Sequence, residues 1–301
     1  MRILVTGASG LIGSALVPFL GANGHRVIRL VRSQSPTPTL GECWGWDPER
    51  GTILSAGREE LDAVVHLAGE NIAGARWTPR RKALIRDSRV NSTRVLSDLI
   101  GRRSSPPKVL VCASAIGYYG DRGDEMLREE SAPGSGFLPE VCREWEAACQ
   151  PAADKGIRVV NLRIGVVLST AGGALAKMLT PFRLGAGGVI GSGHQFMSWI
   201  ALDDVASAIH FALTHDSLRG PVNTVAPNAV TNRDFTRTLG RVLSRPTVFP
   251  MPAFVARLAL GEMADALLLA SARVVPARLL ESGFAFRYPD LEGTLRHLLK
   301  D

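Results

Sequence analysis

The chain has 301 residues, of which 46% are hydrophobic and 21% are charged, and its formal net charge at neutral pH is +7. This length is sufficient for one large domain or two smaller ones with a sizeable core. No apolar run approaches the roughly 20 residues that span a bilayer, and the apolar start runs directly into a glycine turn rather than forming a signal peptide. We therefore expect a cytoplasmic protein without a membrane partner.

Basic residues are dispersed along the chain, with only short groups at 80–82 and 102–103. Nucleic-acid-binding proteins concentrate such residues in a stripe interleaved with aromatic side chains, so we expect no nucleic-acid partner. A dispersed positive surface favours small anionic molecules. The four cysteines lack Cys-x-x-Cys spacing and the six histidines lack His-x-x-x-His spacing, so we expect reduced thiols and no metal site.

A short apolar strand over residues 2–6 breaks into Gly7-x-x-Gly10-x-x-Gly13, and a helix is predicted from Leu11 to Leu20. Such a turn lets the backbone approach a pyrophosphate, which then lies at the helix N-terminus. Gly10 leaves out the Cβ that would block the phosphate, and Gly13 allows close packing of the helix. A strand-to-helix turn without a ligand is the alternative. The residues expected at the cofactor in this turn are Gly7, Ser9, Gly10, Leu11, Ile12 and Gly13.

The end of the second predicted strand, over residues 26–31, indicates which dinucleotide binds. Arg32 and Ser33 follow this strand, where an NAD-specific site has an acidic residue that accepts hydrogen bonds from the ribose hydroxyls. An arginine there binds a 2′-phosphate instead, so NADP(H) is the predicted cofactor, with both residues at that phosphate. An exposed strand-end cation is the alternative for Arg32. Trp46 ends a short strand near the expected adenine, although core packing is the commoner role for such a residue.

Strands and helices alternate through the first half of the chain. Further apolar strands are predicted at 63–67, 108–112 and 158–162, with helices at 79–100 and 137–154 between them. Continuous apolar runs are typical of strands that are covered on both faces. The alternation therefore predicts an α/β fold with a doubly wound, Rossmann-type parallel sheet and right-handed crossovers.

Beyond Arg163 the pattern changes to glycine-rich loops and short helices. We interpret residues 1–165 as the cofactor domain, with recruitment of 199–226. Residues 166–301 are then a smaller, mainly helical lobe that caps it, with a specialised segment from about residue 246. In this lobe, helices are predicted at 174–184, from 203, and at 253–272, 276–282 and 291–300, and a strand at 221–226.

Several motifs together resemble those of an extended short-chain dehydrogenase/reductase. They are the glycine turn at 6–13, His66-Leu67-Ala68-Gly69, Ser114-x-x-x-Tyr118-Tyr119-Gly120 and the segment 199–205. More narrowly, the chain resembles the atypical "epimerase family" group of NADP(H)-binding proteins. The segments that carry this narrower resemblance are 67–72, 114–120, 143–147, 191–195, 260–262 and 275–279, and it covers essentially the whole chain.

The resemblance implies that Leu67, Ala68 and Gly69 pass beneath the adenine ribose, where small residues let the backbone come close. It also implies that Glu70 and Arg76 reach the cofactor from the loop that follows. Surface ion pairs are the alternative for both of these charged residues.

Typical members of this superfamily use a tyrosine as the proton donor, a lysine four residues later that lowers its pKa, and a serine that polarises the substrate. This chain has no Tyr-x-x-x-Lys. Alignment of the helix that begins at Phe137 places Leu138 at the tyrosine and Cys142 at the lysine. Ala115 stands at the expected serine position, and Ser114 is one residue away.

Three replacements are conceivable. Tyr118 or Tyr119 could supply a phenol, with a packing aromatic as the alternative. Glu146 could act as a general acid or base if burial raises its pKa, with a helix-surface salt bridge as the alternative. Cys142 has no histidine nearby in sequence to activate it, so an inert thiol is favoured. Ser114, Tyr118, Tyr119 and Glu146 are thus the catalytic candidates.

Two further residues are candidates for ligand contact. His194 lies in a glycine loop where it could meet substrate, and Arg163 follows a strand at the edge where ligands bind in open sheets. The leading hypothesis is an NADP(H)-dependent oxidoreductase or epimerase, monomeric or homodimeric, that acts on a small carbonyl or nucleotide-sugar substrate. The alternative is a non-catalytic NADP(H)-binding sensor or interaction protein.

Overall fold

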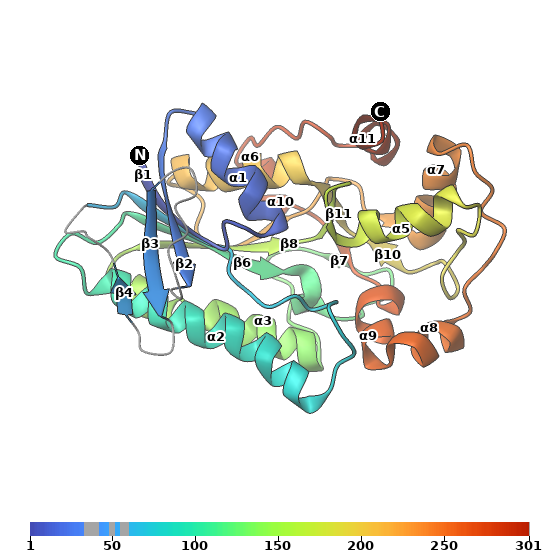
Figure 1. Ribbon diagram of the computed structural model, residues 1–301, viewed down its shortest axis with the longest axis horizontal. Helices are drawn as coiled ribbons and strands as arrows, with labels where there is room; N and C mark the ends of the chain where they lie inside the picture. The colour runs from blue at the N-terminus through green and yellow to red at the C-terminus, as the bar shows by residue number, and fades with distance from the viewer. Residues whose placement is uncertain (33–41, 48–51, 55–59, 301) are drawn as a thin grey trace.

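The computed structural model describes residues 1–32, 42–47, 52–54 and 60–300 (Figure 1). Ser33 and the side chain of Arg32, both expected at the 2′-phosphate, lie outside the described part.

An eight-stranded sheet crosses the molecule in the order β12-β8-β6-β5-β1-β2-β3-β4. All neighbouring strands in it are parallel except β4, which runs antiparallel to β3. This arrangement confirms the predicted doubly wound Rossmann-type fold. The strands are β1 (Arg2–Thr6), β2 (Arg26–Arg32), β3 (Glu42–Asp47), β4 (Thr52–Leu54), β5 (Ala63–His66), β6 (Val109–Ala115), β8 (Arg158–Ile164) and β12 (Gly220–Thr224).

Helices cover both faces of the sheet, which explains why its central strands are apolar on both sides. Figure 1 shows α1 (Leu11–Ala22) and α6 (Leu202–Thr214) on one face, and α2 (Pro79–Gly101) and α3 (Phe137–Ala147) on the other. All of β5 and nearly all of β1 are therefore buried. The loops that leave these two neighbouring strands diverge, because β1 is followed by a crossover to β2 and β5 by one to β6. This is the switch point at which open α/β sheets bind ligands.

Local signals set the helix ends. The Thr78 side chain caps α2 by accepting a hydrogen bond from the Arg81 amide, and Pro79 begins the helix, as such sequences predict. The helix predicted over 137–154 is instead divided into α3 and α4 (Gln150–Ala153). Pro151 lacks an amide proton and its ring disfavours the preceding helical turn, so the first helix ends before it.

The second half of the chain both completes the main sheet and forms the helical C-terminal region. Strand β12 pairs with β8, and α6 packs on α1. The helix predicted over 253–272 is interrupted at Gly261, whose φ of +62° no helix accommodates. The remaining elements are η1 (Ile116–Tyr119), β7 (Met126–Leu127), β9 (Val166–Leu168), α5 (Gly173–Arg183), β10 (Phe196–Met197), β11 (Trp199–Ala201), β13 (Val230–Thr231), α7 (Asn232–Val242), α8 (Ala253–Leu260), α9 (Glu262–Ala264), the π-helical turn Asp265–Leu269, β14 (Arg273–Val274), α10 (Ala277–Glu281) and α11 (Leu291–Leu298).

Candidate active site

The glycine turn after β1 has the geometry of an anion site. Gly7 has a φ of +66°, and a Cβ added to Gly13 would stand 2.2 Å from the Gly7 carbonyl oxygen, so both glycines are required by the protein's own backbone. A Cβ on Gly10 would meet only that oxygen, at 3.3 Å. Gly10 also begins α1 without a side-chain cap, which leaves the first amides of the helix for a ligand. The turn therefore fits the diphosphate of a dinucleotide.

A buried hydrogen-bond cluster joins this turn to the end of β5. Thr6 Oγ1 lies 2.7 Å from His66 Nδ1 and accepts hydrogen bonds from the amides of Leu67 and Ala68, at 3.1 and 3.2 Å. Burial lowers the pKa of His66 to about 4, so the imidazole is neutral. Because Thr6 Oγ1 already accepts from two amides, its hydroxyl donates to Nδ1, and the ring carries its own proton on Nε2. Trp46 packs edge-on against this ring and is 2% exposed, which places it in the core rather than at the surface.

The charged residues of the following loop are engaged with other parts of the protein. Glu70 Oε1 lies 2.9 Å from Arg81 Nη1 on α2. Arg76 Nη2 donates to the Leu258 carbonyl oxygen of α8 at 2.6 Å. These contacts connect the loop to α2 and to the C-terminal region, and cofactor contact by Glu70 and Arg76 stays a prediction.

Three of the predicted site residues meet where β6, β8 and α3 converge. Ser114 Oγ donates to Glu146 Oε1 at 2.7 Å. Arg163 Nε and Nη2 donate to the two oxygens of the same carboxylate at 2.8 and 2.9 Å. The Arg163 side chain is 3% exposed and that of Glu146 is 13% exposed. Burial opposes the arginine charge, but the hydrogen bonds and charge of Glu146 raise the pKa of Arg163. The result is a buried, two-point ion pair that holds Glu146 against Ser114.

The two tyrosines of η1 differ in their surroundings. Tyr119 is fully buried; its hydroxyl donates to Asn223 Oδ1 at 2.7 Å and accepts from Arg163 Nη1 at 2.9 Å. Burial raises the pKa of Tyr119 to about 12, which suits a packing role. Tyr118 is partly exposed, and the Arg163 guanidinium lies 3.4 Å from its ring centroid. Tyr118 is therefore the tyrosine of this pair with access to the surface.

Leu138 and Cys142, at the positions of the usual tyrosine and lysine, both lie beside η1. A Cβ built on Gly117 would stand 3.4 Å from Leu138 Cβ and 3.8 Å from Cys142 Sγ. Burial raises the pKa of the Cys142 thiol to about 12, so this thiol stays protonated. Neither side chain carries a charge at the place where the lysine of typical members would carry one.

The sequence analysis did not predict one charged residue at this site, Arg89. Arg89 lies on the buried face of α2, four residues after Ile85 and four before Thr93, and its guanidinium packs against Gly69. A basic residue at helical spacing among buried positions was the available signal.

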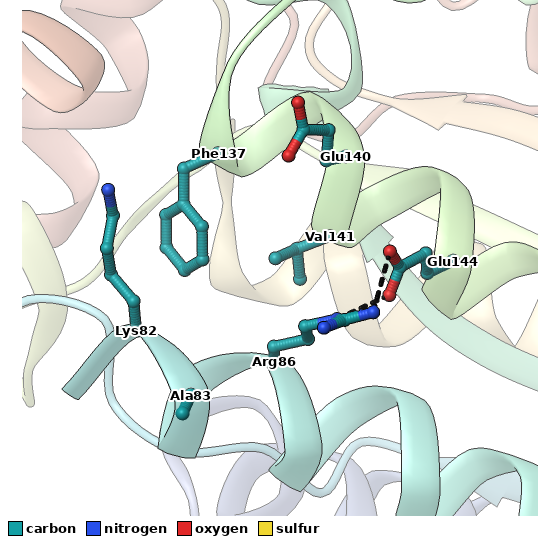
Figure 2. A pocket seen from close by; sticks show the side chains of 7 residues that line it. All are labelled: Lys82, Ala83, Arg86, Phe137, Glu140, Val141 and Glu144. Atoms are coloured by element: carbon teal, nitrogen blue, oxygen red, sulfur yellow. Dashed lines mark hydrogen bonds and ion pairs between the residues drawn. The ribbon is translucent and has the colours of Figure 1, made fainter. Parts of the chain in front are cut away.

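His194 is exposed in its loop, and substrate contact by this residue stays a prediction. A separate pocket between α2 and α3 has a volume of about 330 Å³. Figure 2 shows Lys82 and Arg86 of α2 facing Phe137, Val141 and Glu144 of α3 there. Its lining includes none of the predicted site residues. Within the described ranges, no helix is long and apolar enough to cross a membrane, and no three His, Cys, Asp or Glu side chains gather as metal ligands would.

Comparisons with known proteins match the whole chain. The NAD dependent epimerase/dehydratase family matches residues 3–225, and a domain of unknown function, DUF1731, matches residues 251–298. The epimerase family protein Mb2239 of Mycobacterium bovis is 43% identical over 95% of this chain and 93% of its own length. The human epimerase family protein SDR39U1 is 36% identical over 99% of this chain and 100% of its own length.

Solved structures show the same relationship. The crystal structure of human SDR39U1 (isoform 2) with NADPH has a TM-score of 0.90 at 36% identity and covers 99% of both chains. UDP-N-acetylglucosamine 4-epimerase from Bacillus cereus has a TM-score of 0.76 at 18% identity, covering 99% of this chain and 98% of its own. The second likeness concerns the fold alone.

Proposed function

This chain belongs to the NAD dependent epimerase/dehydratase family, as its motifs indicated, and we propose that it is an NADP(H)-dependent oxidoreductase or epimerase that uses Ser114 and Glu146 to move the proton. Support for the cofactor comes from the glycine turn, from Arg32 at the end of β2, and from the human relative, which was crystallised with NADPH. The proposed substrate is a small carbonyl compound or nucleotide sugar.

The observation that carries the proton assignment is the 2.7 Å hydrogen bond from Ser114 to Glu146. In the direction of alcohol oxidation, the substrate hydroxyl gives its proton to Ser114 Oγ while the serine proton passes to Glu146 Oε1. In the direction of carbonyl reduction, both transfers reverse. A bound nicotinamide supplies the hydride chemistry. Arg163 holds the carboxylate in place through both of its oxygens, so Glu146 keeps one orientation toward the serine.

A specific observation also favours the second candidate, a non-catalytic NADP(H)-binding sensor. Leu138 and the buried Cys142 lie beside η1, at the positions of the usual tyrosine and lysine. A nicotinamide bound next to these two apolar side chains would lack the proton donor of typical members. The two candidates differ in whether any substrate is turned over.

The test measures NADPH oxidation with a panel of carbonyl compounds. With a panel of nucleotide sugars it measures formation of the epimer, because an epimerase regenerates its cofactor in each turnover. Ser114→Ala and Glu146→Gln should each lower kcat by about 10²–10⁴-fold, while the Kd for NADPH stays near that of the wild type. Glu144→Gln is the matched control, because this exposed carboxylate on the same helix pairs with Arg86 instead.

Brisk turnover that neither Ser114→Ala nor Glu146→Gln reduces would contradict the proton relay. Tight NADPH binding without turnover of any substrate in the panel would favour the sensor. Far-UV circular dichroism of each variant separates loss of the reaction from loss of the fold.

A further inference from the structure

Two histidines that are far apart in the sequence meet beside the contact between α1 and α6. His25 lies in the turn between α1 and β2, and His210 lies in the last part of α6. Their Nε2 atoms are 2.9 Å apart, and the two ring planes are inclined by 48°. Both side chains are partly exposed, so a small ion from solvent can reach the pair.

The separation of these two nitrogen atoms fits a metal site as well as a hydrogen bond. Imidazole nitrogens bind divalent metals at about 2.0–2.1 Å, so two ligands at right angles on one ion are about 2.9 Å apart, whereas two tetrahedral ligands are about 3.3 Å apart. Right angles between neighbouring ligands are typical of the tetragonal geometry of Cu²⁺ and Ni²⁺. The observed 2.9 Å therefore fits these two ions better than Zn²⁺.

The surroundings of the two rings leave the Nε2 atoms available to an ion. Coordination through Nε2 requires the proton of a neutral imidazole to be on Nδ1. His25 Nδ1 lies 3.3 Å from the amino nitrogen of Met1, which orients this ring from its other side, as partners outside the coordination shell do in metal sites. Phe19 of α1 packs edge-on against His210, with 6.0 Å between the ring centroids. Small rotations of the two rings would therefore aim both Nε2 atoms at one ion.

A third histidine near this pair is engaged with its own helix end. His215 Nδ1 lies 3.0 Å from the Phe211 carbonyl oxygen, and its ring stacks on the Phe211 ring with 3.5 Å between centroids. Because no three potential ligands gather anywhere in the described ranges, water would supply the other ligands. The sequence analysis expected no metal site from the spacing of the histidines, but 185 residues separate these two, so spacing along the chain does not reveal them.

We propose that His25 and His210 form a two-histidine site for Cu²⁺ or Ni²⁺, in which the ion takes the place of the hydrogen-bonded proton and water fills the remaining positions. The ion links the turn between α1 and β2 to α6. It binds the folded chain alone, since the two histidines come together only on folding, and it therefore stabilises the fold. The site is separate from Ser114 and Glu146 and goes beyond the proposed function.

The test uses the full chain without a polyhistidine tag, with one equivalent of Cu²⁺ at pH 7.5, where imidazole is neutral. Pulsed electron paramagnetic resonance counts the imidazoles bound to Cu²⁺ and should find two in the wild type but one in His25→Gln and one in His210→Gln. In calorimetric titrations each substitution should weaken Cu²⁺ binding at least tenfold, because loss of a group that merely supports a ligand already costs about 10–100-fold. Zn²⁺ should bind the wild type more weakly than Cu²⁺.

His215→Gln is the matched control, because this histidine lies at the end of the same helix but contacts Phe211, and it should bind Cu²⁺ as the wild type does. Ni²⁺ should raise the Tm of the wild type and of this control, and should leave the Tm of the double variant His25→Gln/His210→Gln unchanged.

Equal Cu²⁺ affinity in the wild type and the double variant would mean an adventitious ion only, and would overturn the proposal. A single imidazole on Cu²⁺ in the wild type, or loss of binding in His215→Gln, would overturn the assignment of the two ligands. None of these measurements involves turnover or NADPH, so this proposal and the proposed function fail separately.

Discussion

Acidification should destabilise the protein through His66, the last residue of β5, whose buried ring faces α2. Its Nδ1 accepts from Thr6 Oγ1, and Ser92 Oγ lies 3.4 Å from Nε2. Burial disfavours the charged ring and lowers the pKa of His66 from its ordinary value of 6.5 to about 4. In the unfolded chain the same ring accepts a proton near its ordinary pKa. The unfolded state therefore binds more protons than the folded state between these two values.

The sign follows from linkage: stability rises with pH across this window and is lost as the pH falls from about 6.5 toward 4. At pH 5 the loss relative to pH 7.5 is about 2 kcal/mol, and it approaches about 3 kcal/mol once the pH is below the folded pKa. For a chain of 301 residues, a loss of 2 kcal/mol corresponds to a fall in Tm of roughly 3 °C.

Urea unfolding at pH 7.5 and pH 5 measures this contribution. The wild type should lose about 2 kcal/mol more than His66→Gln between the two pH values, because the glutamine does not titrate. His194→Gln is the control, since this histidine is exposed in a loop, and it should follow the wild type. Parallel stability profiles for the wild type and His66→Gln would refute the reasoning, because they would mean that the buried ring contributes nothing to the pH dependence.

Three further predictions concern the ion pair and the cofactor. Arg163→Met should destabilise the fold by about 3–5 kcal/mol, because it leaves the Glu146 carboxylate without its partner; adding Glu146→Leu should recover part of this loss in urea unfolding, and a strictly additive double mutant would contradict the coupling. Gly10→Val should abolish NADPH binding, measured by fluorescence titration, in a protein with an unchanged circular dichroism spectrum; wild-type affinity would mean that the turn serves structure alone. The protein should bind NADPH more tightly than NADH, and Arg32→Ala should remove the difference; equal affinities in the wild type would refute the 2′-phosphate assignment.

Short stretches of the sequence were sufficient to predict those strands and turns that depend mainly on neighbouring residues. The apolar runs of β1, β5, β6 and β8 predicted a sheet that is covered on both faces, since each strand carries its own hydrophobic pattern. The glycine turn was recognisable because Gly7 and Gly13 are required by contacts within a few residues or with the adjoining strand. The helix predicted over 137–154 was too long because the apolar pattern continues across Pro151, which interrupts the hydrogen bonding.

The sequence by itself thus determined the α/β architecture, the position of the dinucleotide turn and the absence of a Tyr-x-x-x-Lys pair. Only the tertiary structure decided which other side chains come together at this site. Ser114, Glu146 and Arg163 lie on three different elements, and their hydrogen bonds depend on the adjacency of β6 and β8 and on the packing of α3. The exposed or buried state of a charge, as at Arg89, likewise depends on partners distant in the chain. Electrostatic contacts of this kind act over a few ångströms in space, so the order of residues does not reveal them until the chain has folded.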